Sequence, residues 1–371
     1  MRLDDLPTPA LLLDVDVLEA NLRRMADRTR ELGVTLRPHI KTHKCIEIAE
    51  RQLALGATGI TVSTLYEAGV FADHGFGDIT WAFPLIPSRI AELEAVCKKA
   101  RTGVVVDSLP AVEALSGSGF PARVWLKVDC GYHRAGVDPA GPYAETVVRA
   151  IAEEPQMEFA GILSHSGHAY SGRSTAEIEA ISEEERRVMT TLADRLRRAG
   201  FEVPDISVGS TPSMAQVKSL KGVTEVRPGN YAFYDRAQVA LGSCSYRDCA
   251  ATVLATVVSS QPGAAHCVID AGALALSKDP GPDAEPCSMG QIYEEYASGR
   301  LAADARVISL SQEHGIVAGP YPVGTRLRIL PNHSCLTVAN FDTYWLVRGT
   351  EVIGRWRIWS GRERAAAIPE N

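Results

Sequence analysis

The sequence predicts an α/β protein made of a (β/α)8 barrel of the TIM type and a C-terminal, mostly β domain. Three observations lead to this fold class. The chain has 371 residues, about two to three times the usual domain length, which suits one large barrel or two domains. Up to about Arg236, short β-rich runs alternate with amphipathic helical stretches. Beyond Gly242, short strands are separated by turns instead.

The expected barrel strands are short, apolar and rich in β-branched residues. In chain order they are Thr35–His39, Gly59–Val62, Asp78–Ala82, Gly103–Val106, Arg123–Val128, Phe159–Ser164, Asp205–Val208 and Thr224–Arg227. Helical patterns lie between them, for example over Val17–Leu32, Thr64–Asp73, Pro87–Lys99 and Thr175–Ala199. Eight such β–α units over about 220 residues fit a closed barrel better than an open sheet. The first strand is not followed by a GxGxxG motif, which speaks against a dinucleotide-binding fold.

The second domain is expected to be mostly β. Its predicted strands are Thr252–Ser260, His266–Asp270, Arg306–Ser309, Thr325–Leu330 and Tyr344–Val347, with one short helix near Gln291–Ala297. The strand-like run Pro9–Leu13 precedes the first barrel helix and is a candidate to pair with this later domain. We therefore predict a barrel domain over residues 14–242 and a β domain formed by residues 1–13 and 243–371.

Composition narrows the class of partner and the compartment. With 38 basic and 45 acidic residues the net charge is −7, which disfavours a nucleic-acid or anionic-membrane surface. The apolar run near the N-terminus is short and is interrupted by Asp14 and Asp16, and no run reaches the length of a membrane helix. The eight cysteines are scattered, so no disulfide framework is expected. We expect a cytoplasmic protein that acts on a small molecule, without nucleic acid or membrane as partner.

The end of the first predicted strand carries the first candidate catalytic residue. Catalytic side chains of such barrels lie at the carboxyl ends of the strands. There the chain reads Arg-Pro-His-Ile-Lys-Thr-His-Lys over residues 37–44. A lysine at the barrel mouth is desolvated, which lowers the pKa of its ammonium group and frees the amine to form an imine. Lys41 is therefore a candidate Schiff-base lysine, and the alternative is an ordinary surface lysine in a polar loop.

The loops after the seventh and eighth strands are rich in glycine and small hydroxyl residues. They read Gly209-Ser210-Thr211-Pro212-Ser213 and Pro228-Gly229-Asn230-Tyr231. Barrels commonly hold a phosphate there, because backbone N–H groups and hydroxyls can approach it closely, although such loops are often plain turns. Together with an imine-forming lysine, a phosphate loop describes a pyridoxal phosphate site.

A third candidate site lies in the predicted β domain, at His333-Ser334-Cys335. On a strand, residues two apart point to the same face, so His333 and Cys335 could bind one metal ion. Sulfur with nitrogen favours zinc. A single His-x-Cys pair can also reflect core packing or chance.

Taken together, these motifs resemble the D-serine dehydratase and D-threonine aldolase family. The matching pieces are Thr8-Pro9-Ala10, the 37–44 stretch, Arg134, His165, Gly209–Pro212, Arg227–Tyr231 and His333–Cys335. Members of this family are fold-type III pyridoxal phosphate enzymes, akin to alanine racemase. The match runs over nearly the whole chain, and the lysine motif combined with the late His-x-Cys is its specific part.

The resemblance implies a role for each candidate residue in an alanine racemase-like fold. Lys41 would hold pyridoxal phosphate and act as the base at Cα, Arg134 would reach O3′ of the cofactor, and His165 would pack against its ring. Ser210, Thr211, Gly229 and Asn230 would hold the phosphate, with Tyr170 as a further cofactor contact. Arg227 would either face the pyridine nitrogen or serve the structure. His333 and Cys335 would bind a divalent metal, with zinc expected.

Two reactions are compatible with this implied site. The first is zinc-assisted β-elimination of D-serine, or a related D-β-hydroxy amino acid, to a 2-oxo acid and ammonia. The second is retro-aldol cleavage to glycine and an aldehyde, as in D-threonine aldolases. Aldolases of the family typically carry aspartate where this chain has Cys335, which favours the dehydratase reaction. The resemblance also implies a homodimer.

Two further hypotheses are less consistent with the chain. A non-catalytic pyridoxal phosphate carrier is a single barrel, whereas the residues after Gly242 form a predicted second domain with an intact His-x-Cys. A racemase would need a second base on the opposite face of the substrate, and the two metal ligands would serve no purpose in its reaction.

Overall fold

The computed structural model of this protein describes residues 1–282 and 288–362. It divides into two compact units. Of the described residues, the barrel unit comprises Ala26–Lys41, Ile48–Gly229 and 361–362, and the sheet unit comprises Met1–Met25, Thr42–Glu47, 230–282 and 288–360. The expected domain boundaries at 13/14 and 242/243 stay a prediction. No helix in the described ranges is both long and apolar enough to cross a membrane.

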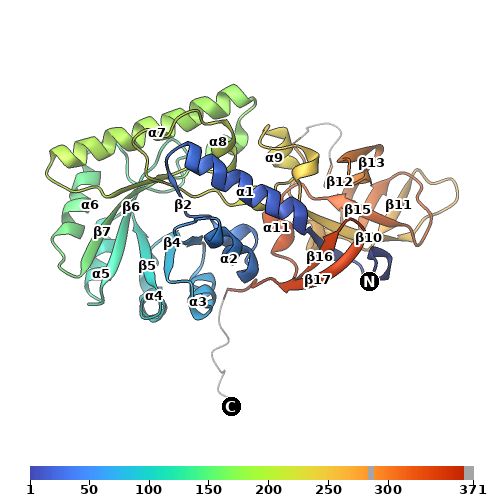
Figure 1. The fold of residues 1–371 in the computed structure, drawn as a ribbon, viewed down its shortest axis with the longest axis horizontal. Helices are drawn as coiled ribbons and strands as arrows, with labels where there is room; N and C mark the ends of the chain where they lie inside the picture. The colour runs from blue at the N-terminus through green and yellow to red at the C-terminus, as the bar shows by residue number, and fades with distance from the viewer. Residues whose placement is uncertain (283–287, 363–371) are drawn as a thin grey trace, which may run out of the picture. The chain divides into compact units, whose positions relative to one another are not determined.

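The barrel unit contains an eight-stranded sheet whose paired strands are all parallel (Figure 1). In chain order the strands are β2 (Thr35–Leu36), β3 (Ile60–Val62), β4 (Asp78–Pro84), β5 (Arg101–Val106), β6 (Ala122–Lys127), β7 (Met157–Leu163), β8 (Asp205–Val208) and β9 (Glu225–Val226). They are ordered β2-β9-β8-β7-β6-β5-β4-β3, and a bridge between His39 and Thr61 joins the two ends. The TIM-type barrel is thus confirmed.

Helices follow the strands as the alternation predicts. They are α1 (Val15–Glu31), α2 (Ile46–Ala54), α3 (Leu65–Asp73), α4 (Ile90–Cys97), α5 (Leu109–Ser116), α6 (Tyr143–Ala152), α7 (Thr175–Arg198) and α8 (Thr211–Gln216), with short 3-10 turns η2 (Ile40–Thr42), η3 (Pro87–Arg89) and η4 (Gly167–Ser171). The long α7 is capped by Ser174, whose side chain accepts a hydrogen bond from the Glu177 N–H. Its last turn carries three arginines, which suit the negative end of the helix dipole.

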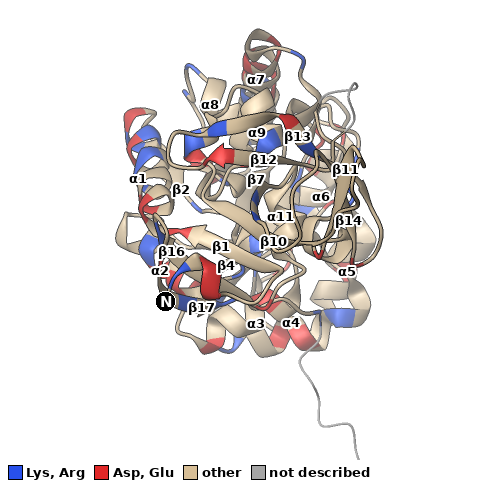
Figure 2. Cartoon of the chain, turned by 90° about the vertical axis from the view of Figure 1, so that its right-hand side faces the viewer, with Lys and Arg blue, Asp and Glu red and all other residues tan. Residues whose placement is uncertain are grey.

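Charged residues of both signs lie along the exposed part of α1 (Figure 2). Ion pairs join Arg23 to Glu19 at 3.5 Å and Arg30 to Asp27 at 2.6 Å. Pairs of this kind, three or four residues apart on an exposed helix, stabilise it by only a few tenths of a kcal/mol each. The helix is therefore held mainly by its buried residues, such as Leu18 and Leu22.

The sheet unit is built on a nine-stranded sheet ordered β11-β14-β13-β12-β15-β10-β1-β16-β17. The strands are β1 (Ala10–Asp14), β10 (Ala251–Ser259), β11 (His266–Ile269), β12 (Gly290–Glu295), β13 (Arg300–Leu310), β14 (Gly315–Ala318), β15 (Arg326–Leu330), β16 (Thr343–Arg348) and β17 (Glu351–Arg357). Because β11 also pairs with β10, the six strands β10 to β15 close into a small antiparallel barrel. Short helices complete the unit: η1 (Leu3–Asp5), η5 (Asn230–Ala232), α9 (Arg236–Ala240), η6 (Tyr246–Asp248), α10 (Ala273–Leu276) and α11 (Ser334–Val338).

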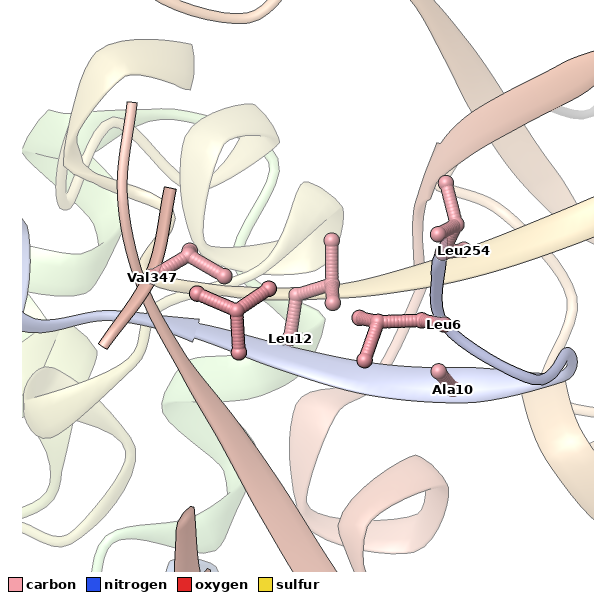
Figure 3. Packing of buried hydrophobic residues seen from close by; sticks show 6 residues of the cluster. Leu6, Ala10, Leu12, Leu254 and Val347 are labelled. Atoms are coloured by element: carbon pink, nitrogen blue, oxygen red, sulfur yellow. The ribbon is translucent and has the colours of Figure 1, made fainter. Parts of the chain in front are cut away.

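The N-terminal strand belongs to the later β domain, as the sequence suggested. Strand β1 pairs antiparallel with β10 and parallel with β16. Its side chains pack into a buried cluster that contains Leu6, Ala10, Leu12, Leu254 and Val347 (Figure 3). The two ends of the chain therefore share one hydrophobic core.

The expected helix near Gln291–Ala297 is wrong. Residues Gly290–Glu295 form strand β12, which pairs with β13 on one side and β15 on the other. The buried Ile292 and Tyr293 favour a strand, and both sheet neighbours bond to the backbone. The sequence patterns did not predict strands β14 and β17. Cys287 and most of the C-terminal tail lie outside the described residues.

Candidate active site

Lys41 lies just beyond the carboxyl end of β2, in the turn η2. The backbone is fixed there from both sides, because the N–H of His39 donates to Pro228 O at 3.0 Å and the N–H of Thr61 donates to Pro38 O at 2.8 Å. The Lys41 side chain is half-buried. The structure thus puts this lysine at the strand end where the sequence predicted a catalytic group.

Positive charges gather around His165, which follows β7. Burial lowers the pKa of His165 well below its ordinary value, and the charges of Lys41, Lys127, Arg134 and Arg227 lower it further. The imidazole is therefore neutral at neutral pH. Carboxylates already act on two of these cations, Glu185 on Lys127 and both Glu225 and Glu185 on Arg227. The negative charge of a phosphorylated aromatic aldehyde would also suit this group.

Lys127, at the end of β6, is a further member of this group that no sequence motif indicates. Burial and the nearby charge of Arg227 lower its pKa to about 8. One feature of the sequence could have indicated it: Lys127 ends a buried strand, where a charged residue is rare.

Arg227 is buried at the end of β9 and is firmly anchored. Its guanidinium donates to the hydroxyl of Ser207 and to the carbonyl oxygen of Ser164. Ser207 in turn donates to Glu225 Oε1 at 2.6 Å, and Arg37 donates to Glu225 Oε2 at 2.6 Å. A structural role for Arg227 is therefore clear, and its role toward a pyridine nitrogen stays a prediction.

Arg134 and Tyr170 are both exposed. The Arg134 guanidinium lies 4.8 Å from the ring centroid of Tyr132. The Tyr132 ring also meets His165 edge-on at 6.1 Å. Arg134 is thereby brought to the His165 group, whereas Tyr170 lies on η4 with 40% of its surface exposed.

The predicted phosphate residues of the barrel unit follow neighbouring strands. After β8, Ser210 is the N-cap of α8 and Thr211 is the first residue of that helix. Gly229 lies three residues beyond β9, the strand paired with β8. All three are buried. Asn230 belongs to the sheet unit instead.

The predicted strand geometry of the His-x-Cys motif is wrong. His333 is the N-cap of α11, and Cys335 lies in the first turn of that helix. The fold still brings the two side chains together. Burial alone would lower the pKa of His333, but Cys335, Asp235 and Asp279 outweigh it and raise that pKa to about 10.

The surroundings of this pair suit a metal ion. His333 Nδ1 lies 2.6 Å from Asp279 Oδ2, a contact that orients metal-binding histidines in many proteins. The described residues contain no cluster of three or more His, Cys, Asp or Glu side chains placed to bind a metal. An imidazole nitrogen and a thiolate sulfur are nonetheless ligands that zinc prefers, and two protein ligands leave positions for substrate oxygen.

Asn230 packs against the same loop. Its amide donates to Asp235 at 2.7 Å, to Ser334 at 3.1 Å and to Cys335 Sγ at 3.6 Å. Its Oδ1 atom is buried without a hydrogen-bond partner. The structure thus links Asn230 to the metal candidates, a neighbourhood that the sequence did not indicate.

Comparison with known families now defines the class of protein. Residues 13–237 match the family described as alanine racemase, N-terminal domain, and residues 250–347 match the putative serine dehydratase domain. The chain therefore has an alanine racemase-like pyridoxal phosphate barrel with a dehydratase-type β domain.

Relatives over the full length define the family. The chain is 35% identical to D-threo-3-hydroxyaspartate dehydratase of Delftia sp. (strain HT23), across 95% of this chain and 97% of that protein. The solved structure of that enzyme superposes with a TM-score of 0.91 and covers 98% of this chain and 100% of the other. The chain is also 35% identical to D-serine dehydratase of Dictyostelium discoideum, across 95% of this chain and 96% of that protein. For D-threonine aldolase of Arthrobacter sp. the identity is 32%, across 95% and 92%. This protein belongs to the D-serine dehydratase and D-threonine aldolase family, and it is a lyase.

Proposed function

We propose that this protein is a pyridoxal phosphate- and zinc-dependent lyase that converts D-serine, or a related D-β-hydroxy amino acid, to a 2-oxo acid and ammonia. The observation that carries the proposal is the lysine at the end of the first barrel strand. Its charge acts on His165 together with those of Lys127, Arg134 and Arg227. Such a concentration of cations suits an anionic cofactor bound covalently to Lys41.

The remaining cofactor contacts follow from the same arrangement. Arg134 would bind the ring hydroxyl, and the neutral His165 would pack on the ring. Arg227 would face the pyridine nitrogen while staying anchored on Ser207. The phosphate would be held by Ser210, Thr211, Gly229 and Asn230, with Tyr170 nearby.

The bound groups supply two kinds of chemistry: pyridoxal phosphate stabilises negative charge at Cα of an attached amino acid, and zinc polarises a hydroxyl group. Within that setting, the freed amine of Lys41 takes the proton from Cα. Breaking Cα–H and Cβ–O expels the hydroxyl group as water and leaves an aminoacrylate, which water hydrolyses to the 2-oxo acid and ammonia. Removing the hydroxyl proton and breaking Cα–Cβ instead releases an aldehyde and, after protonation of Cα, glycine.

His333 and Cys335 would hold the metal ion. Asp279 would fix the His333 ring by its contact with Nδ1. A solved structure of a D-threo-3-hydroxyaspartate dehydratase, in which one cysteine is replaced by alanine, is in the metal-free form, which supports a cysteine ligand in this family.

Elimination is preferred to aldol cleavage because position 335 is cysteine. The aldolase reaction remains the alternative, since a relative that is 32% identical is a D-threonine aldolase. Both reactions would use the same lysine and the same pair of metal ligands.

Product analysis separates these reactions. Purified, zinc-loaded protein is incubated with D-serine, D-threonine, D-threo-3-hydroxyaspartate and their L-forms, and 2-oxo acid and glycine are measured. We expect pyruvate from D-serine, whereas glycine and acetaldehyde from D-threonine would favour the alternative. The proposal fails if the protein lacks a yellow imine absorbance or if borohydride labels a lysine other than Lys41.

The assembly and the compartment complete the proposal. We expect a homodimer in the cytoplasm, which sedimentation of the purified protein and fractionation of cells expressing it can test. A monomer with full activity would refute the dimer.

A further inference from the structure

Glu185 is a buried carboxylate on the apolar face of α7, outside the set of residues that the resemblance identified. It is 1% exposed and shares its face with Met189 and Leu192. A carboxylate in such surroundings is costly unless hydrogen-bond donors surround it. Its partners therefore show what it does.

Donors from three strand ends of the barrel unit converge on this carboxylate. The hydroxyls of Ser164 and Ser166, both after β7, donate to it at 2.7 Å each. The N–H of Gly209, after β8, donates at 3.2 Å, and the thiol of Cys130, after β6, lies at 3.8 Å. One side chain thus ties together three loops at the carboxyl end of the sheet, where the active site lies.

A chain of hydroxyl groups leads from Glu185 to Ser210. The hydroxyl oxygens of Ser166 and Ser213 are 2.8 Å apart, and those of Ser213 and Ser210 are 2.7 Å apart. Each hydroxyl has one proton to donate. Because Ser166 gives its proton to the carboxylate, Ser213 must donate to Ser166, and Ser210 must donate to Ser213. The three serines are all at most 2% exposed, so the order of the chain is set from within.

We propose that Glu185 is a positioning residue for the cofactor phosphate. It holds the loop Gly209–Ser213 in place, through the Gly209 N–H and through the ordered hydroxyls of Ser166, Ser213 and Ser210, so loss of the carboxylate loosens the loop beside which the phosphate would bind. This inference rests on the proposed function, since it requires that a phosphate bind beside Ser210.

The test compares two ligands that differ only in the phosphate. Apoprotein is titrated with pyridoxal phosphate and with pyridoxal, and binding is followed by the imine absorbance. Glu185→Ala removes the acceptor, and Ser166→Ala cuts the chain at its first link. In both variants we expect pyridoxal phosphate to bind about tenfold more weakly, and pyridoxal to bind within about twofold of the wild type.

Conservative variants separate positioning from general structure. Glu185→Gln keeps one oxygen that can accept from Gly209 and Ser166, so its affinity for pyridoxal phosphate should stay within about threefold of the wild type. Ser210→Ala leaves the link between Glu185, Ser166 and Ser213 intact. Its affinity for pyridoxal phosphate should fall by less than about fivefold, which is the effect of a lost helix cap. The matched control is Glu184→Gln, which changes the same helix at an exposed residue paired with Arg187.

Each outcome decides the proposal. An equal loss for both ligands, or no loss in Ser166→Ala, overturns the positioning role. A loss beyond tenfold in Ser210→Ala overturns the direction of the chain, because a direct hydrogen bond to the charged phosphate would then be missing. If Glu185→Ala does not fold, Ser166→Ala and Glu185→Gln still decide. Failure of the wild type to bind either ligand would instead refute the proposed function itself.

Discussion

The hydroxyl oxygen of Thr42 lies 3.2 Å from Sγ of Cys335, so the residue after the proposed cofactor lysine contacts a proposed metal ligand. The neighbouring residues are fixed to the same sheet unit. The Tyr344 hydroxyl donates to His43 O at 2.7 Å, and the N–H of Trp359 donates to Lys44 O at 2.8 Å. The segment that follows Lys41 is thus held by the strands of the unit that carries the metal loop.

This contact predicts an effect of Thr42 on metal affinity. A hydroxyl that donates to a zinc-bound thiolate stabilises its negative charge, and loss of such an outer contact typically weakens metal binding tenfold or more. Thr42→Val should therefore lower zinc affinity by about tenfold while leaving pyridoxal phosphate binding intact. Competition with a fluorescent chelator measures zinc affinity, and imine absorbance measures pyridoxal phosphate binding. Thr343→Val is the control, and equal zinc affinity in Thr42→Val and wild type would contradict the prediction.

Removal of the metal should separate cofactor binding from catalysis. Cys335→Ala, or treatment of the wild type with a chelator, should lower 2-oxo acid formation from D-serine by at least about a hundredfold, because a Lewis acid stabilises the leaving hydroxyl by several kcal/mol. The yellow absorbance should remain. Added zinc should restore the chelated wild type but not the variant. Full activity of metal-free protein would rule out a catalytic metal.

The shared core of the two chain ends predicts a stability effect. Leu12 is fully buried in the cluster with Leu254 and Val347 (Figure 3). Leu12→Ala should lower the free energy of unfolding by about 3 kcal/mol, through lost burial and the cavity left behind. Urea unfolding measures this change. Ile353→Ala, on the exposed side of β17, is the control, and a loss no larger than in that control would contradict the packing described.

The fold could be predicted where local patterns determine it. The barrel strands are continuous apolar runs, and Asp205–Val208 was placed at its observed bounds. Strand β12 was mistaken for a helix because a single strand carries little local information when pairing partners on both sides define it.

The candidate site divides in the same way. Lys41, His333 and Cys335 stand in short motifs that can be read along the chain. Glu185 could not be found, because in the run Glu183-Glu184-Glu185 only the partners far along the chain distinguish it from its exposed neighbours.

Lys127 predicts a conflict between stability and cofactor binding. Burial and the charge of Arg227 lower its pKa from 10.5 to about 8. Folding therefore disfavours the ammonium form, and this cost is fully present below about pH 8 and disappears as the pH rises toward 10.5. Lys127→Met removes the cost, so the apoprotein of this variant should be more stable than wild type at pH 7 by about 3 kcal/mol at most.

The difference should shrink as the pH is raised above 8, where wild-type Lys127 is already neutral in the folded protein but still charged in the unfolded chain until the pH approaches 10.5. Urea unfolding of both apoproteins across this range measures it. The same variant should bind pyridoxal phosphate about tenfold more weakly, because one positive charge beside the anionic cofactor is lost. Lys98→Met, at an exposed lysine paired with Glu94, should change neither property. A Lys127→Met apoprotein that is less stable than wild type at pH 7 would contradict this prediction. It would show that other groups of the folded apoprotein already stabilise the Lys127 ammonium, without the cofactor.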